Sequence, residues 1–176
     1  MNRWMRRALF TAILGLLLFS GWRVVGQMQA ERHAQAEPER ALRWRSDHPG
    51  ALLVLAERQL AKGDSSAAQA TARRLLAREP MHGEAFRVLA EAADRQGRRT
   101  DAFTLYRIAA RRSPRDLQTR AWLTQRHLEQ GDYAQALVQI DRILRMSPQR
   151  ARSIHPVLVQ LAQDQGFAAA LAQTLR

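Results

Sequence analysis

The chain has 176 residues, 46% of them hydrophobic but only 6% aromatic, a composition that suits a globular all-α protein and disfavours disorder, a β-sandwich or a β-barrel. Its formal net charge is +12, yet the basic residues are scattered at helical spacing without an aromatic stacking platform, so we expect no nucleic-acid partner. The absence of cysteine excludes disulfide bonds, thiolate metal sites, a lipoprotein anchor and a cysteine nucleophile.

The N-terminus combines a basic tail, residues 1–7, with an uncharged apolar run, residues 8–22. That run spans about 22 Å as a helix, and continuing it to Gly26 gives about 28 Å, close to the roughly 30 Å hydrocarbon core of a bilayer. Arg23 then lies near the interface, where an arginine costs much less than at mid-bilayer. The sequence therefore predicts a transmembrane signal anchor at 8–26.

A cleaved secretory signal is the alternative, because a basic start followed by a short apolar run also defines one. Val24-Val25-Gly26 makes a poor cleavage site with Arg23 beside it, which favours the uncleaved anchor. The positive-inside rule leaves the tail 1–7 in the cytoplasm. For a Gram-negative cell we therefore expect a single-pass inner-membrane protein with the rest of the chain in the periplasm.

Residues 27–48 are expected to form a stalk and a capping helix. Pro38 ends the polar stalk and suits the first turn of a new helix over 38–45. Leu42 and Trp44 need burial, and we expect them to cover the exposed face of the first unit that follows.

From residue 49 the chain repeats with a period of 34 residues. Glycine, alanine and proline each return in phase: Gly63, Gly97 and Gly131; Ala68, Ala102, Ala136 and Ala170; Pro80, Pro114 and Pro148. Such a period is the signature of a solenoid built from one repeated supersecondary unit. We assign three units to 49–150, beginning at Pro49, Gly83 and Leu117.

Each unit is predicted to hold two helices, A and B, separated by the glycine. In the second unit Phe86, Leu89, Ala90 and Ala93 form the apolar stripe of helix A, and Ala102, Leu105, Tyr106 and Ala109 that of helix B. The in-phase alanine gives room where the two helices cross. Leu55, Leu89 and Leu123 on the A helices, with Leu75, Ala109 and Ile143 on the B helices, complete the predicted core.

These residues resemble the tetratricopeptide repeat (TPR) family. The resemblance covers 49–150 well and 151–176 loosely, and it departs at Arg120, which stands where the family favours an aromatic and where the other units have Leu52 and Phe86. It implies an all-α solenoid of about three repeats that binds a protein or peptide, here in a membrane-anchored bacterial form.

The tail, residues 151–176, is expected to be a partial repeat or C-terminal cap. We predict a helix from about Ile154 to Gln165 and a short one from Phe167 onward, while Gly166 lags the glycine register by one residue. Either this pair folds back as a cap, or the sequence belongs to a longer protein.

No residues are predicted to be catalytic, to hold a metal or to bind a cofactor. The five histidines lack metal-ligand spacing, and no nucleophile elbow, phosphate loop, dinucleotide fingerprint or zinc-protease motif occurs. We therefore expect a non-enzymatic protein.

The candidate binding surface is the concave wall that TPR solenoids build from their A helices. The positions not used for packing are Leu53, Glu57, Leu60, Arg87, Glu91, Asp94, Ala121, Gln125 and Leu128. They form a mixed apolar and acidic wall and lack the basic and asparagine clamp by which some TPR domains hold a terminal carboxylate. We expect an extended or helical segment with apolar anchors and some positive charge to bind there.

A second group of eight arginines lies toward the ends of the B helices: Arg73, Arg74, Arg78, Arg107, Arg111, Arg112, Arg142 and Arg145. Cations at helix C-termini complement the helix dipole, which suffices to explain them. Lipid headgroups or an acidic polysaccharide are the alternative ligands for this edge, because the anchor keeps it near a membrane.

The sequence thus predicts a membrane-anchored adaptor or scaffold that holds a protein or peptide partner during assembly of an envelope complex. Its plan resembles single-pass TPR proteins of cytochrome c maturation and TPR components of polysaccharide export, pilus or secretion systems. The alternative is a permanent structural subunit of an inner-membrane complex for polysaccharide synthesis or export.

Overall fold

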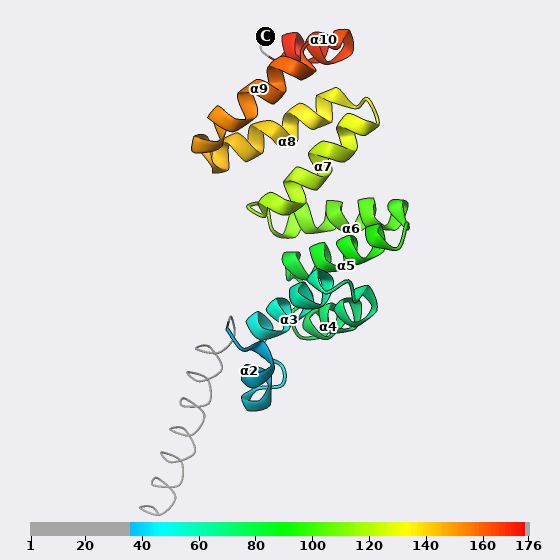
Figure 1. Ribbon diagram of the computed structural model, residues 1–176, viewed down its shortest axis with the longest axis vertical. Coiled ribbons are helices and arrows are strands. Elements are labelled where there is room, and N and C mark those ends of the chain that lie inside the picture. The colour runs from blue at the N-terminus through cyan, green and yellow to red at the C-terminus, as the bar shows by residue number, and fades with distance from the viewer. Residues whose placement is uncertain (1–35, 175–176) are drawn as a thin grey trace, which may run out of the picture. The chain divides into compact units, whose positions relative to one another are not determined.

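The computed structural model describes residues 36–174 (Figure 1). The predicted basic tail 1–7, the membrane anchor 8–26 and the stalk up to residue 35 lie outside the described residues. None of the helices between residues 36 and 174 has both the length and the apolar character needed to cross a membrane. The chain divides between Pro80 and Met81 into two compact units.

The described part of the first unit contains three helices, α2 (Pro38–Trp44), α3 (Pro49–Ala61) and α4 (Ser65–Arg78). Helices α3 and α4 pack as an antiparallel pair, and α2 packs against α3 (Figure 1). Ala41 of α2 and Ala51 of α3 are fully buried together, with Leu42 partly buried beside them. Trp44, however, is 53% exposed, so the prediction that it is buried in the cap is wrong: the helix is only seven residues long and ends at Trp44.

The second unit continues the same pattern of antiparallel pairs and adds two helices after a short 3-10 turn. Its elements are α5 (Gly83–Arg95), α6 (Arg99–Arg112), α7 (Leu117–Glu129), α8 (Tyr133–Met146), η1 (Pro148–Arg150), α9 (Ala151–Leu161) and α10 (Gln165–Thr174). Helix α5 pairs with α6 and α7 with α8, while α6 also contacts α7. All described secondary structure is helical, as the sequence predicts.

The residues that recur every 34 positions occupy equivalent places in the helix pairs. Ala68, Ala102 and Ala136 each have 0% exposure on the second helix of a pair, which confirms that these positions need a small side chain. Gly63, Gly97 and Gly131 adopt φ values of 84°, 75° and 69° in the turns. That left-handed backbone is nearly free of cost for glycine alone, so each turn directly follows from the residue type.

The predicted core is largely confirmed, with the A-helix leucines less buried than expected. Leu75, Ala109, Ile143 and Leu123 are at most 8% exposed, but Leu55 and Leu89 are only partly buried. Between α5, α6 and α7 the core is dominated by small residues around Tyr106, with Leu123 from α7 closing it.

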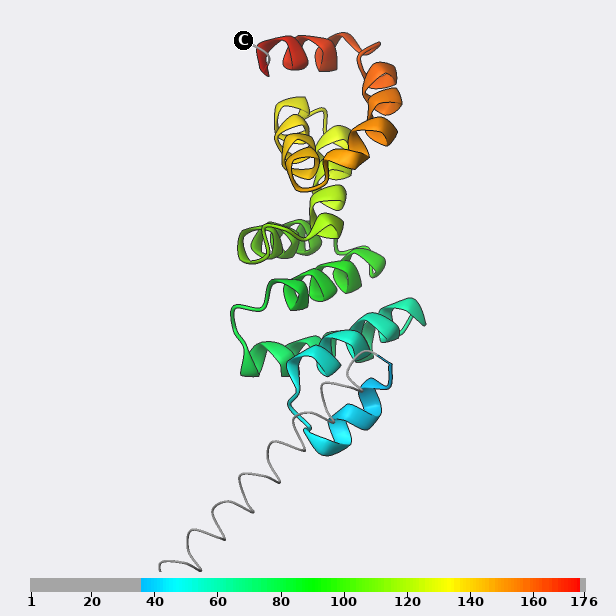
Figure 2. The ribbon, with the colours of Figure 1, turned by 90° about the vertical axis from the view of Figure 1, so that its left-hand side faces the viewer.

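The C-terminal helices have bounds different from the predicted ones. Helix α9 ends at Leu161 rather than Gln165, because α10 begins at Gln165 and the Asp164 carboxylate accepts a hydrogen bond from the Phe167 backbone N–H at 3.0 Å. Phe167 is fully buried in edge-to-face contact with Tyr133, and α10 packs on α8. Figure 2 shows α9 as the link between the α7–α8 pair and α10.

Gly166 lies inside α10 rather than in a turn, which explains why it departs from the glycine register. A Cβ atom at this position would lie 2.9 Å from Cε2 of Tyr133, closer than side-chain carbons pack. The glycine is therefore needed for close packing of α10 on α8, not for a left-handed turn.

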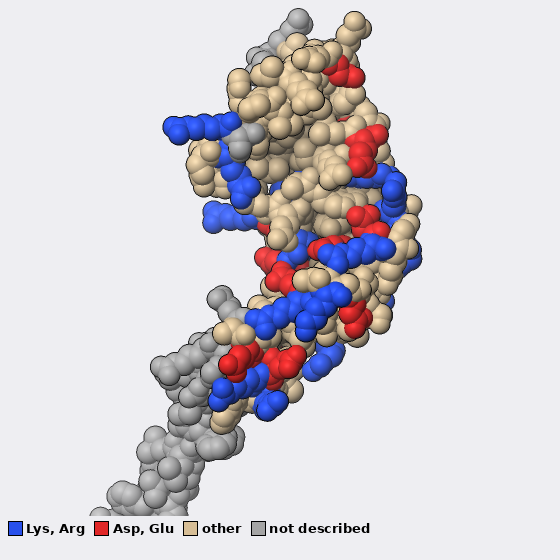
Figure 3. Space-filling model, in the orientation of Figure 1, with Lys and Arg blue, Asp and Glu red and all other residues tan. Residues whose placement is uncertain are grey.

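Charged side chains of both signs share the surface. Figure 3 shows lysine and arginine intermixed with aspartate and glutamate on the face drawn, with few charges over α10. Eight described arginines form ion pairs with carboxylates, most of them exposed and within one helical turn. Such exposed pairs contribute less than about 1 kcal/mol each, so the fold is held by its apolar core.

Candidate functional site

In the first unit, the three predicted surface residues of α3 differ in accessibility. Leu60 is 2% exposed and belongs to the core between α3 and α4. Leu53 and Glu57 are partly buried, one turn apart on the same helix. Leu60 is therefore a packing residue, whereas Leu53 and Glu57 keep part of their surface accessible.

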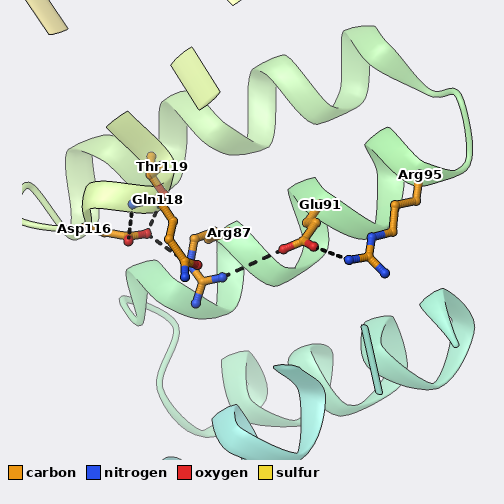
Figure 4. Close-up of polar contacts among 6 residues, drawn as sticks. All are labelled: Arg87, Glu91, Arg95, Asp116, Gln118 and Thr119. Carbon is orange, nitrogen blue, oxygen red and sulfur yellow. Dashed lines mark hydrogen bonds and ion pairs between the residues drawn. The ribbon is translucent and has the colours of Figure 1, made fainter. Parts of the chain in front are cut away.

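Arg87 of α5 lies 5% exposed at the centre of a polar network within the second unit (Figure 4). Its Nε atom lies 3.1 Å from Oδ2 of Asp116, and one terminal nitrogen lies 3.9 Å from Glu91. Glu91 in turn pairs with Arg95 at 2.6 Å. The guanidinium group of Arg87 is thus buried and ion-paired inside the protein and is not part of an open binding surface.

Asp116 connects this network to the start of α7. It is the N-cap of that helix: its carboxylate accepts hydrogen bonds from the Gln118 backbone N–H and from the Thr119 hydroxyl (Figure 4). A carboxylate at this position satisfies an otherwise unpaired backbone donor and complements the helix dipole. Arg87 and Asp116 therefore fix α5 and α7 relative to each other, which positions the cleft described next.

A cleft of about 240 Å³ opens between α5 and α7. The structure brings two predicted residues together here, Asp94 from α5 and Gln125 from α7, with Trp122 between them. The indole N–H of Trp122 donates a hydrogen bond to Oδ2 of Asp94 at 3.0 Å. The polar rim comes from Arg99, Arg126 and Glu129.

Aromatic stacking holds Trp122 in place. Its ring stacks on Tyr106 with centroids 4.0 Å apart and an interplanar angle of 19°. The Phe103 ring lies tilted beside it, with its centroid 6.4 Å away. Burial, together with the negative charges of Glu91 and Asp94, raises the pKa of Tyr106 above its usual range, so its hydroxyl stays neutral. The cleft therefore has a rigid aromatic wall next to a carboxylate.

The remaining predicted residues lie on α7. Ala121 is exposed and one turn before Gln125, so these two share a face. Leu128 is partly buried. At the end of this face, hydrogen bonds from Gln125 and Arg126 lower the pKa of Glu129 and keep its carboxylate charged.

Sequence reasoning missed two notable residues of α7: Trp122, which lines the cleft, and Arg120, which lies outside it. Trp122 is absent from the predicted binding surface, although it lines the cleft and its indole N–H donates to Asp94. Arg120 is 4% exposed and hydrogen-bonded within the protein. The sequence signal was an arginine at the position where the other two repeats have Leu52 and Phe86, because a charged side chain at a core position needs buried hydrogen-bond partners.

Residues 36–174 show no cluster of three or more histidine, aspartate or glutamate side chains arranged to hold a metal ion. What the cleft offers chemically is an aromatic surface, two carboxylates, two guanidinium groups and an amide. Such a set binds polar and apolar side chains of another molecule without supplying a paired nucleophile and base.

Comparison with known protein families gives a match for the central part of the chain. Residues 53–116, which include α4, α5 and α6, match the family model described as a tetratricopeptide repeat. A comparison with curated proteins found no significant match to the chain. Tetratricopeptide repeats commonly serve as protein-binding scaffolds and are typically non-catalytic.

Proposed function

We propose that this chain, whose residues 53–116 carry tetratricopeptide repeats, is a non-enzymatic scaffold that holds a peptide segment of a partner protein in the cleft between α5 and α7. The observation that carries the proposal is the cleft itself. It joins the A helices of two successive repeats, and its wall is a tryptophan fixed by stacking and by a hydrogen bond to Asp94.

The size and chemistry of the cleft favour a peptide. A volume of about 240 Å³ accommodates one or two side chains rather than a drug-sized cofactor, whose sites span about 300–1,000 Å³. Trp122 offers an apolar contact, and the carboxylates of Asp94 and Glu129 offer acceptors to a cation, beside the guanidinium groups of Arg99 and Arg126. The expected occupant is an extended or helical segment with an apolar anchor next to a lysine or arginine.

We further propose that residues 8–26 anchor the protein in the inner membrane as a single pass, with 1–7 in the cytoplasm and the repeats in the periplasm. The uncharged run and the three arginines before it support this arrangement. Alkaline phosphatase fused after residue 176 should then be active, and the protein should stay in the membrane at full length. An inactive fusion alongside an active cytoplasmic reporter, or recovery of a shortened soluble protein, would contradict this arrangement.

In that setting the partner belongs to an envelope assembly, such as cytochrome c maturation, polysaccharide export, a pilus or a secretion system. A photoreactive amino acid at Gln125 should crosslink one protein in cells, whereas the same group at Ala134, an exposed position on α8, should not. The crosslinked protein is then purified for binding measurements.

Gln125→Arg combined with Ala121→Arg should weaken binding of that partner at least tenfold, because both changes add bulk and positive charge to the face that leads into the cleft. Ala134→Arg adds the same kind of side chain elsewhere and should leave the affinity unchanged. Equal affinities for all three proteins would refute the cleft as the binding site. A stoichiometric complex that never releases the partner in mild detergent would instead support a permanent structural subunit.

A further inference from the structure

A second, strongly basic groove lies between α6, α7 and α8, away from the cleft at Trp122. It encloses about 470 Å³. Its polar lining consists of four arginines, two glutamines and one histidine: Arg107, Arg111, Arg120, Arg142, Gln135, Gln139 and His127. The side chains that line it within the described residues include no aspartate or glutamate.

Arg120 forms the buried inner part of this groove. Its guanidinium group donates hydrogen bonds to the carbonyl oxygens of Ala110 at 2.9 Å and Pro114 at 3.3 Å, and to Oε1 of Gln139 at 2.8 Å. All three acceptors are neutral, so they satisfy the donors without cancelling the charge. A guanidinium group stays protonated in proteins, and its positive charge therefore persists in a poorly solvated place.

The other three arginines are exposed and also lack a carboxylate partner. None of Arg107, Arg111 and Arg142 forms an ion pair with any residue in the part of the chain that the structure describes, although eight other arginines there do. Burial, together with the positive charge of Arg142, lowers the pKa of Arg120, while the negative charge of Asp116 acts in the opposite direction. Like charges gathered around a concave surface without carboxylates in its lining attract an anion.

The shape of the groove suits an elongated ligand. Arg107 and Arg111 lie one turn apart on α6, and Gln135, Gln139 and Arg142 form a row of about 10 Å along α8. Phe103, one turn before Arg107 on α6, and Leu123 on α7 contribute apolar surface. A ligand that fills the groove therefore needs negative charge, apolar groups and polar groups along its length.

We propose that this groove binds an acidic segment of a partner protein. Arginine forms bidentate hydrogen bonds with aspartate and glutamate carboxylates, and the exposed amide of Gln135 can both donate to and accept from a peptide backbone. Free phosphate would bind the arginines but make no contact with the Gln135 amide or with the apolar surface of Phe103 and Leu123. A lipid surface would reach the exposed arginines but not Arg120 inside the groove.

This groove is separate from the cleft at Trp122, because the two use different faces of α7. Arg120 and Leu123 face the groove, whereas Trp122 and Gln125 line the cleft. The inference rests on the proposed function only in taking a protein as the occupant. The crosslink from Gln125 tests the cleft, and the assay below tests the groove without using that partner.

The test measures fluorescence anisotropy of a labelled peptide of repeated Asp-Leu-Glu-Gly units with the full chain in mild detergent at low salt. We expect saturable binding, and at least tenfold weaker binding of the matched peptide with asparagine and glutamine in place of the acids. Arg107→Glu combined with Arg111→Glu should weaken acidic-peptide binding at least tenfold. Arg142→Glu alone should weaken it by a smaller but measurable factor. Arg73→Glu with Arg152→Glu changes the net charge equally at exposed sites outside the groove and should change binding less than twofold.

Three results would overturn the proposal. One is equal binding of the acidic and neutral peptides or no binding of either. Another is an equal loss in the Arg73 and Arg152 control, which would indicate a general charge effect. The third is tighter groove-dependent binding of inorganic phosphate, alginate or phosphatidylglycerol vesicles than of the peptide, which would assign the groove to a small anion, a polysaccharide or a membrane.

Discussion

Ala102 shows how one small side chain determines the packing of a helix pair. It has no exposed surface and lies in the cluster around Tyr106, with Ala90 and Ala93 from the facing helix. Ala102→Leu adds three carbon atoms where no space is left, so we expect a loss of about 1–3 kcal/mol in the free energy of unfolding. Ala70→Leu on the exposed side of α4 is the control and should change stability by less than about 0.5 kcal/mol. Urea unfolding followed by circular dichroism compares them, and equal stabilities would contradict the packing role.

Arg120 is the residue at which the buried polar interactions of the second unit concentrate. Arg120→Met keeps most of the side-chain volume but removes the donors to Ala110, Pro114 and Gln139, leaving buried acceptors unsatisfied. We expect a loss of about 2–3 kcal/mol in the free energy of unfolding. Arg120→Met with Gln139→Leu removes donor and acceptor together and should recover about 1 kcal/mol of the lost free energy of unfolding. Additive losses in this double-mutant cycle would show that the Arg120–Gln139 contact contributes nothing.

At the scale of the element, α6 begins less favourably than α4 and α8. Asp64 and Asp132 cap α4 and α8 by accepting hydrogen bonds from the backbone N–H groups of Ala67 and Gln135. Arg98 holds the same place before α6 with a similar backbone, φ −82° and ψ 65°, but makes no side-chain cap. Its ion pair with Asp101 is about half exposed on both sides and is worth little.

We therefore expect Arg98→Asn to stabilise the protein by about 0.5–1 kcal/mol, because asparagine is a strong N-cap residue and the backbone already has the required conformation. Asp64→Ala removes the corresponding cap of α4 and should cost about 1 kcal/mol. Thermal unfolding of both variants beside the unmodified chain gives the comparison. A destabilised Arg98→Asn protein would mean that the exposed pair with Asp101 outweighs the cap.

The elements that the sequence predicts best are those with a local steric cause. A glycine with positive φ ends each A helix, and a 34-residue period places α3, α5 and α7 at Pro49, Gly83 and Leu117. The predicted bounds of the two C-terminal helices were wrong because Asp164 and Gly166 act through contacts with Phe167 and Tyr133, which sequence spacing does not reveal.

The site was predictable only in part for the same reason. Asp94 and Gln125 lie in one cleft, as predicted residues of a binding surface should. Leu60 and Arg87 are buried instead. Their burial depends on the neighbouring helix, which the spacing within one helix does not reveal.

At the scale of the whole molecule, stability follows burial along the chain and differs sharply between helices. Helix α5 buries seven of its 13 residues, whereas none of the α9 side chains that the structure describes is buried. Val157 and Val159 are 52% and 54% exposed, and Pro156 removes one backbone donor inside α9. In a solenoid, stability is nearly a sum of local and nearest-neighbour terms, so a helix with little buried surface opens without unfolding the rest.

Hydrogen exchange of the full chain, followed by mass spectrometry, should therefore show fast exchange over 151–161 and slow exchange over 83–112. Helix α10 should be intermediate to slow, because Phe167 is fully buried and packs on Tyr133. Phe167→Ala should speed exchange in α10 and at the start of α8 while leaving α5 and α6 unchanged, since α10 packs on α8 and Phe167 contacts Tyr133. Protection of α9 equal to that of α6 would contradict the expectation. It would mean that the exposed valines are covered in solution, and repeating the exchange at several protein concentrations would show whether a second copy covers them.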